Sequence, residues 1–407
     1  MHRRAFLSTL AAGAAGRLLP GQAGLEWNTP PPADCPAARS TIIKGLLFTG
    51  RHAEYAHADT WYPSWAADDH LYSPWTDGEV NGVRCSSAGA NASTGHATIT
   101  GDSPLALTIT GAATYPSSPA PYGGRYPCGS LVHNGVWYYG TYCLDDSDGD
   151  PGKGLNWDIL GPFVGFRYST DFGESWTQTP HTPASPLFAE PVRQDGPVKI
   201  GAPHFVDFGR NLRHSPDGKA YLVGHGAVAG DPSPRLGGAN LSWITGDQIY
   251  LARVEPTIAN INDRSRYEFF AGRDRQGRAI WTHNFAKIQP IFDWNNNAGC
   301  VTMTYIAPLK RYLMCVTDGG NTISEFNTYL LESEFVSGPW KLVEYLKAFG
   351  EQAYFVNIPS KFVSADGRTI WLMYAANFTN GNQNWPQHQA RPVGSRYGMC
   401  LQEVQLR

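Results

Sequence analysis

One pattern recurs along the chain: a short apolar strand, a tight turn, and a second strand rich in Tyr or Trp. Five such hairpins lie at residues 59–78, 128–146, 202–226, 299–320 and 356–377. Further strand-like segments lie between them, and no helical periodicity runs for more than a few residues. Strand pairs repeated at intervals of several tens of residues predict an all-β protein, a β-propeller in which four-stranded blades are arranged radially.

The composition agrees with this fold class. Charged residues make up only 16 % of the 407 residues and aromatic residues 13 %, beside 44 Gly and 30 Pro, so a disordered chain and a coiled coil are both disfavoured. The net charge of −3 provides no basic field, and we therefore expect neither a nucleic-acid partner nor a membrane partner. Trp and Tyr rings on a weakly charged surface suit a sugar ligand, because rings stack on the C–H faces of sugars.

A single motif supports the propeller prediction. Residues Ser169–Trp176 match S-x-D-x-G-x-x-W, the Asp box of sialidase-like propellers. Asp171 and Gly173 would shape the turn between outer strands, and Trp176 would pack between blades, so we assign the motif a structural role. The five readable hairpins would give unusually long blades and seven blades would have ordinary lengths, so spacing alone leaves the blade number open.

The first residues predict export from the cytoplasm. Arg3 and Arg4 precede Ala5, Phe6 and Leu7 and then a short run rich in Ala and Gly, which resembles a twin-arginine signal. This run is too short to span a bilayer. We expect residues 1–30 to be the signal and to be removed, and residues 31–407 to form a single propeller domain, monomeric and located in the periplasm or outside the cell.

The seven cysteines suit an oxidising compartment. Cys128 and Cys143 bracket one hairpin, and Cys300 and Cys315 bracket another with the same separation. We expect each pair to face each other across its hairpin, where a disulfide is feasible. The odd total leaves at least one thiol unpaired.

Blade topology sorts the polar residues by face. The start of the innermost strand, the end of the second strand and the start of the third share one face, and this face collects most of the candidate residues. They are Arg51, His52, His57, Asp59, His96, Arg125, Tyr142, Asp145, Lys199, His204, His225, Asn295–Asn297, Asp318, Glu351, Tyr354, Asn357 and Asn377. Such a convergent polar set predicts the functional site.

We expect no required cofactor and assign no metal ligands. The acidic run at residues 145–150 offers oxygen ligands for a structural cation such as calcium. It lacks the remaining EF-hand spacing, and we interpret it as a solvated loop.

Two family resemblances accompany these patterns. Residues 58–78, 120–145, 294–305 and 349–362 resemble secreted propellers related to the rhamnose-glucuronate lyases of gum arabic. Those enzymes are seven-bladed, so this resemblance favours seven blades, and they have glycosidase relatives on the same scaffold. Residues 246–254 and 267–281 resemble five-bladed propellers that include endo-D-arabinan hydrolases.

The first resemblance implies β-elimination of a uronate-containing polysaccharide, which is our main prediction. A lyase neutralises the uronate carboxylate, removes the C5 proton and protonates the leaving oxygen. We assign Arg125 to the carboxylate, and Tyr142 with His96 or His204 to proton transfer. His225, Asp59, Asn296, Tyr354 and Asn357 are assigned to substrate binding.

Two alternatives remain open. An endo-arabinanase-like or rhamnosidase-like glycoside hydrolase would need two carboxyl groups, for which Asp59, Asp145 and Glu351 are candidates. A noncatalytic glycan-binding propeller would keep the aromatic and amide groups without chemistry.

Overall fold

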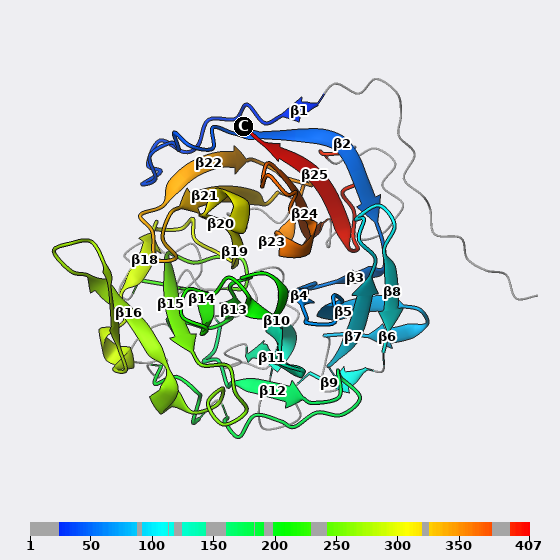
Figure 1. The fold of residues 1–407 in the computed structure, drawn as a ribbon, viewed down its shortest axis with the longest axis vertical. Coiled ribbons are helices and arrows are strands. Elements are labelled where there is room, and N and C mark those ends of the chain that lie inside the picture. Colours follow the sequence, from blue (N-terminus) through cyan, green and yellow to red (C-terminus); the bar gives the residue numbers. More distant parts are fainter. Residues whose placement is uncertain are drawn as a thin grey trace, which may run out of the picture.

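The protein is an all-β propeller, as the repeated hairpins predicted. The computed structural model describes residues 24–87, 92–112, 114–117, 124–143, 160–182, 184–190, 198–228, 242–319, 325–376 and 391–407. These residues form strands, turns and short 3-10 segments, with the strands gathered into five sheets around a central axis (Figure 1). Among them, no helix is long and apolar enough to cross a membrane.

Each sheet is antiparallel and contains one of the five predicted hairpins. Sheet 1 comprises β3 (His57–Asp59), β4 (Ser64–Trp65), β5 (Leu71–Val80), β6 (Val83–Cys85), β7 (Ser93–Thr100), β8 (Thr108–Gly111) and β9 (Tyr115–Pro116). Sheet 2 comprises β10 (Gly124–His133), β11 (Val136–Cys143) and β12 (Phe166–Ser169). Sheet 3 comprises β13 (His204–Phe205), β14 (Ala220–Gly226), β15 (Gln248–Val254), β16 (Glu268–Arg273), β17 (Ala279–Thr282) and β18 (Pro290–Asp293). Sheet 4 comprises β19 (Val301–Ile306), β20 (Arg311–Asp318), β21 (Asn327–Ser333) and β22 (Lys341–Leu346).

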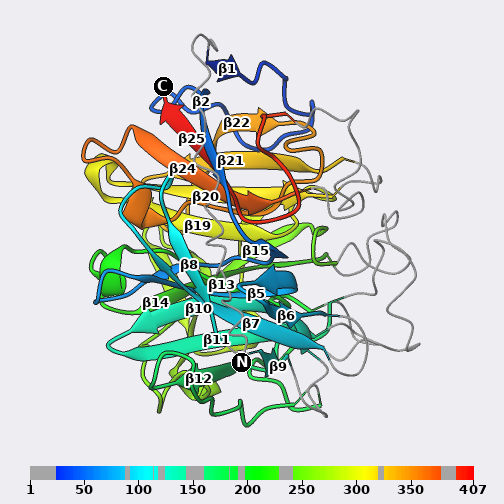
Figure 2. The same ribbon diagram turned by 90° about the vertical axis from the view of Figure 1, so that its right-hand side faces the viewer.

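Sheet 5 closes the ring with strands from both ends of the chain. Its order is β1 (Leu25–Glu26), β2 (Leu46–Glu54), β25 (Cys400–Leu406), β24 (Thr369–Ala375) and β23 (Tyr354–Asn357). Figures 1 and 2 show β2 lying beside β25 at the rim. The ring is therefore held shut by hydrogen bonds between the first and last parts of the fold.

The structure corrects the expected number of blades. The described residues form five sheets, one for each hairpin read in the sequence. No sixth or seventh sheet is present in this part of the chain, so the seven blades favoured by the first resemblance are not formed by it.

The structure also corrects the expected cysteine pairing. Cys315 lies opposite Thr302 rather than Cys300, and both thiols are free. Along β10, Cys128 lies opposite Gly140, whereas Cys143 pairs with Gly124. Both expected pairs are out of register: β19 and β20 pair without interruption in a register that puts Thr302 opposite Cys315, and irregularities interrupt the pairing of β10 with β11.

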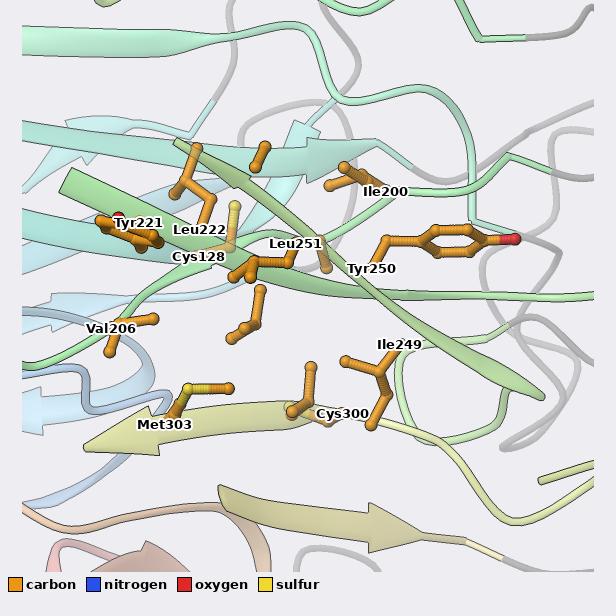
Figure 3. Packing of buried hydrophobic residues seen from close by; sticks show 14 of the residues in the cluster. Cys128, Ile200, Val206, Tyr221, Leu222, Ile249, Tyr250, Leu251, Cys300 and Met303 are labelled. Carbon is orange, nitrogen blue, oxygen red and sulfur yellow. The ribbon is translucent and has the colours of Figure 1, made fainter. Parts of the chain in front are cut away.

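The core lies between neighbouring sheets. Strand β14 is buried along its whole length, since sheets cover both of its faces and both must be apolar. Figure 3 shows Leu222 and Leu251 of sheet 3 in one core cluster with Met303 of sheet 4 and with Cys300, which directly precedes β19. This packing fixes the inner strands, whose ends carry the polar residues discussed below.

Trp176 packs between two sheets, as predicted. Its ring stacks on His96 of β7 at 4.8 Å and meets Tyr139 of β11 edge-on at 4.8 Å. The preceding turn is tied by Asp171, which accepts hydrogen bonds from Ser169 and Ser175, and these bonds lower the pKa of Asp171 to about 2. The segment thus connects sheet 1 to sheet 2.

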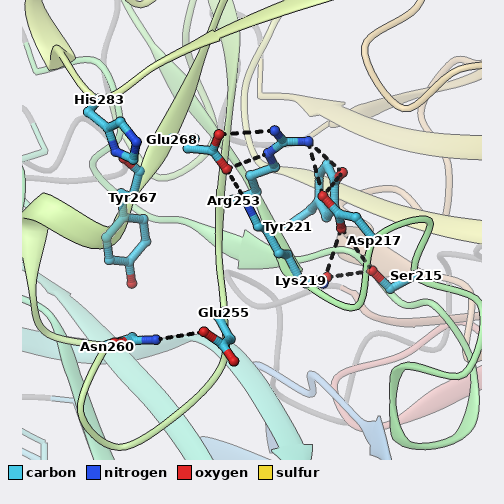
Figure 4. A network of polar contacts seen from close by, with 10 residues as sticks. All are labelled: Ser215, Asp217, Lys219, Tyr221, Arg253, Glu255, Asn260, Tyr267, Glu268 and His283. Carbon is cyan, nitrogen blue, oxygen red and sulfur yellow. Dashed lines mark hydrogen bonds and ion pairs between the residues drawn. The ribbon is translucent and has the colours of Figure 1, made fainter.

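Charged groups of sheet 3 form a structural network (Figure 4). Arg253 donates to both oxygens of Glu268, at 2.9 and 3.1 Å, and to Asp217 at 3.0 Å. Its guanidinium also lies 3.9 Å from the centroid of the Trp281 ring. Asp217 belongs to the turn between β13 and β14, on the face opposite the candidate site. These charged groups therefore connect the strands of sheet 3 and have a structural role.

Candidate active site

A buried carboxyl and several tyrosines meet where the sequence predicted a functional face. Asp59 ends β3 in sheet 1, and Tyr354 begins β23 in sheet 5, 295 residues further along the chain. Tyr142 lies one residue before the end of β11 in sheet 2. Three different sheets therefore supply this group, which only the closed ring brings together.

Asp59 is the chemically distinctive member. Its side chain belongs to a residue that is only 6 % exposed, and its two oxygens accept hydrogen bonds from Thr60 at 2.6 Å and Tyr354 at 2.7 Å. Burial, and next the charge of Asp77, raise the pKa of Asp59 to about 8, against the lowering effect of these hydrogen bonds. The Asp59 carboxyl therefore holds its proton near neutral pH.

Asp77 is the second carboxyl of the group. It follows Thr76 on β5, and Thr76 lies opposite Asp59 in the sheet register. Ser87 donates its main-chain N–H and its hydroxyl to the two Asp77 oxygens, each at 2.6 Å, and Ser86 adds a side-chain hydrogen bond. Burial raises the pKa of Asp77, and the bonds from Ser87 and Ser86 oppose that rise. The environments of the two carboxyls thus differ: Ser87 and Ser86 donate to Asp77, whereas Asp59 accepts from Thr60 and Tyr354.

Tyr397 connects the two carboxyls from the segment that precedes β25. Its hydroxyl donates to the main-chain oxygen of Asp77 at 2.6 Å and also interacts with the Asp59 carboxyl. Its ring lies 5.1 Å from the ring of His57. Burial, and then the charges of Asp59 and Asp77, raise the pKa of Tyr397, so the phenol stays protonated.

Tyr142 lies close to this group but is suited to donating rather than accepting a proton. It is 1 % exposed and stacks on Tyr126 at 5.1 Å. Burial, and then the neighbouring Tyr126, Cys300 and Asp59, raise the pKa of Tyr142 well above its usual value. The tyrosinate that a proton-abstracting base requires is therefore disfavoured at neutral pH.

His204 lies deeper along the axis. Its Nδ1 accepts a hydrogen bond from the Gly129 N–H at 3.3 Å, and its ring lies 4.2 Å from that of Tyr62. Burial, and next the charge of His225, lower the pKa of His204 to about 3, so the imidazole is neutral. His204 and Tyr62 line an internal cavity of about 40 Å³, together with Asn357 and others.

The remaining predicted binding residues have local partners. His225 contacts the Ser242 carbonyl through Nε2 at 2.6 Å, and burial lowers the pKa of His225 to about 4. Asn357 donates to the carbonyls of Trp61 and Phe355, at 3.0 and 2.9 Å. These contacts hold strand ends in place.

Asn296 and His96 also lie apart from the carboxyl pair. Asn296 donates its main-chain N–H to Asp247 at 2.7 Å. The structure places His96 between sheets 1 and 2, where Nε2 lies 2.9 Å from the Tyr139 hydroxyl, and does not bring it to the carboxyls.

Several predicted residues cannot be placed as site groups. Asp145 and Asn377, and the side chain of Arg125, lie outside the described residues. Glu351 lies in the turn before β23, at φ 62°. Among the described residues, no group of three or more His, Cys, Asp or Glu side chains is arranged to hold a metal ion.

Asp77 and Tyr397 were not predicted from the sequence. Asp77 precedes a glycine at the end of the first hairpin, which makes it look like an ordinary turn residue. Tyr397 lies 320 residues from Asp77 along the chain. Sorting the polar residues by blade face could have found Tyr397, because Tyr397 lies just before β25, the third strand of its blade.

No protein-family model matches the sequence, and no curated protein is similar to it. Among solved structures, a family 117 glycoside hydrolase from the marine bacterium Zobellia galactanivorans is 13 % identical, with a TM-score of 0.47 over 89 % of this chain and 90 % of that chain. The catalytic domain of a GH62 α-L-arabinofuranosidase from Coprinopsis cinerea is 10 % identical, with a TM-score of 0.41 over 91 % and 93 %. The endo-arabinase of Bacteroides thetaiotaomicron is 12 % identical, with a TM-score of 0.37 over 86 % and 94 %. Likeness at this level does not extend to substrate or chemistry.

Proposed function

We propose that the protein is a glycoside hydrolase in which Asp59 is the general acid. The observation that carries the proposal is the pairing of two carboxyls in unlike environments. Burial and the Asp77 charge raise the pKa of Asp59 to about 8, while donors surround Asp77. Pairs of carboxyls in unlike environments perform acid and base roles in glycoside hydrolysis.

The proposed reaction needs only these groups and water. Asp59 gives its proton to the glycosidic oxygen as the bond from that oxygen to the anomeric carbon breaks. Water supplies the hydroxyl that the anomeric carbon gains, and its remaining proton returns to the carboxyl pair. Asp77 is the partner carboxylate that both retaining and inverting enzymes require, and the configuration of the released sugar distinguishes the two.

The tyrosines beside the carboxyls are consistent with a sugar substrate. Tyr126, Tyr142, Tyr354 and Tyr397 lie around Asp59 and Asp77, and their hydroxyls remain protonated donors where burial raises their pKa values. The proposal also agrees with the names of the three similar structures, which are glycoside hydrolases, without resting on them.

This proposal replaces uronate elimination as the preferred reaction. Elimination assigned proton abstraction to Tyr142 or a histidine, but burial raises the pKa of Tyr142 and His96 lies between two sheets. We keep the expectation of export by the twin-arginine route as part of the proposal, since plant and microbial polysaccharides are encountered outside the cytoplasm.

Product analysis tests the reaction class. The purified protein is incubated with a panel of neutral and uronate-containing glycans, and both new reducing ends and ultraviolet absorbance are recorded. Hydrolysis predicts new reducing ends without absorbance. A rise in absorbance with each cleavage would establish elimination, because only elimination creates a conjugated unsaturated uronate.

A further inference from the structure

A cavity of about 600 Å³ opens in sheet 1, close to the carboxyl pair. Residues of four strands, β3, β5, β6 and β7, line it. Its lining includes His57 of β3, Glu79 of β5, Arg84 of β6, Ser93 of β7 and the adjoining Ser86. The volume falls in the range of small-molecule sites, about 300–1,000 Å³.

Two contacts join this cavity to the carboxyls. Ser86 lines it and hydrogen-bonds to Asp77. His57 lines it and packs 5.1 Å from the ring of Tyr397, whose hydroxyl bonds to the Asp77 main chain. Asp59 and Asp77 do not themselves line the cavity, so a molecule in it would be separated from the proposed catalytic groups by the Ser86 and His57 side chains.

The wall of the cavity carries a pair of opposite charges. Glu79 and Arg84 lie directly opposite each other on β5 and β6, and Arg84 Nε donates to Glu79 Oε2 at 2.5 Å. This contact uses one donor and one acceptor, so the two Nη groups of Arg84 and Oε1 of Glu79 have no partner among the described residues. Donors and an acceptor are thus presented side by side on a short hairpin.

This arrangement matches two adjacent hydroxyls of a sugar. One hydroxyl accepts from an Arg84 Nη group, and its neighbour donates to Glu79 Oε1. A uronate carboxylate would be attracted by Arg84 but repelled by the adjacent Glu79, so this pair, which has no net charge, gives a charged sugar no net electrostatic advantage over a neutral one.

We propose that this cavity is a subsite for a neutral sugar unit, and that Arg84 and Glu79 determine its specificity. The inference rests on the proposed hydrolase function and deepens it by naming the substrate class. Both residues act in binding and not in bond cleavage.

Kinetics of Arg84→Ala and Glu79→Gln test the subsite. An exposed ion pair contributes little to stability, and with side-chain exposures of 83 % and 43 % these variants should remain folded. On whichever glycan the enzyme cleaves, each should raise KM at least tenfold and leave kcat within threefold. Arg278→Ala is the matched control, because Arg278 forms a similar exposed ion pair with Asp274 at 2.7 Å on the outer hairpin of sheet 3.

Binding measurements separate this proposal from the proposed function. Isothermal titration calorimetry is run with arabinotriose, xylotriose, cellotriose and trigalacturonate, on the wild type if no glycan is cleaved and otherwise on Asp59→Asn. The subsite predicts that at least one neutral trisaccharide binds more tightly than trigalacturonate, and that Arg84→Ala weakens this binding at least tenfold.

Unchanged binding and KM in Arg84→Ala and Glu79→Gln, or preference for trigalacturonate, would overturn the subsite. Loss of activity in Asp59→Asn with unchanged KM in Arg84→Ala would support the hydrolase function and contradict the subsite. Full activity in Asp59→Asn with a raised KM in Arg84→Ala would support the subsite and contradict the role of Asp59 as the general acid.

Discussion

The Tyr354 hydroxyl donates a 2.7 Å hydrogen bond to Asp59 Oδ2 and so joins β23 of sheet 5 to β3 of sheet 1. Sheet 5 is the sheet that closes the propeller, through the pairing of β2 with β25, and the bond links this sheet to its neighbour, sheet 1. The candidate active site is therefore complete only in the closed ring. Three predictions for activity, two for stability and one for export can be measured.

Activity should depend on a protonated Asp59. Because burial and Asp77 raise the pKa of Asp59 to about 8, kcat should fall as pH rises through about 8. A pH–rate profile on a cleaved glycan checks this. A profile that falls between pH 4 and 5 instead would show that the Asp59 carboxyl ionises normally.

The free energy of unfolding should also depend on pH because of Asp59. In the unfolded chain the carboxyl ionises near its ordinary pKa of 3.8, whereas in the folded protein it keeps its proton until about pH 8. The unfolded state then binds fewer protons, so the free energy of unfolding should decrease as pH rises from about 4 to about 8. Asp59→Asn should flatten this part of the urea-unfolding pH profile, and an unaltered slope would contradict the assignment.

Tyr354→Phe should shift the alkaline limb of the activity profile upwards. The hydrogen bond from Tyr354 lowers the pKa of Asp59, so its loss should raise that pKa by about one unit, the order expected for a bond to a charged group. Tyr374→Phe is the control, because Tyr374 is equally buried in sheet 5 and bonds to Ser395 at 2.6 Å. Equal shifts in both variants would point to a general structural effect.

Trp176→Ala should destabilise the fold by about 3–5 kcal/mol, the usual cost of truncating a large buried aromatic. The Trp176 ring fills the space between His96 and Tyr139. Phe335→Ala should cost much less, because Phe335 is 55 % exposed. Urea unfolding of both variants makes the comparison, and equal midpoints would show that Trp176 does not connect the sheets.

Replacing Arg3 and Arg4 by Lys should retain the protein in the cytoplasm, because twin-arginine transport recognises the guanidinium pair. Fractionation of cells expressing each form checks this. Normal export of the double variant would remove the assignment of residues 1–30 as such a signal.

The sequence predicted the fold well where the information is local. Each inner hairpin combines alternating apolar residues with a turn, so all five could be located before their partners were known. The prediction of seven blades rested instead on a resemblance, whereas the described residues form five sheets. The pairing of β2 with β25 is non-local, and no local pattern specifies which strand completes sheet 5.

The candidate site was only partly predictable for a related reason. Sorting by face placed Asp59, Tyr354 and Tyr142 together, because strand direction fixes which end each occupies. It did not place His96 correctly relative to them, since His96 lies inside β7 and its ring turns between two sheets. The raised pKa of Asp59 also depends on the charge of Asp77. This effect arises from how the two side chains pack, which the residue types alone do not reveal.

The most direct test of the central claim is the turnover of Asp59→Asn on two substrates with different leaving groups. Cleavage of a natural glycan needs a proton on the departing oxygen, so Asp59→Asn should lower kcat at least about 100-fold, while Tyr142→Phe should have a mild effect. A dinitrophenyl glycoside of the same sugar leaves without protonation, and on it Asp59→Asn should approach wild-type turnover. Wild-type turnover of the natural glycan by Asp59→Asn, or an equal loss on both substrates, would contradict the role of Asp59 as the general acid.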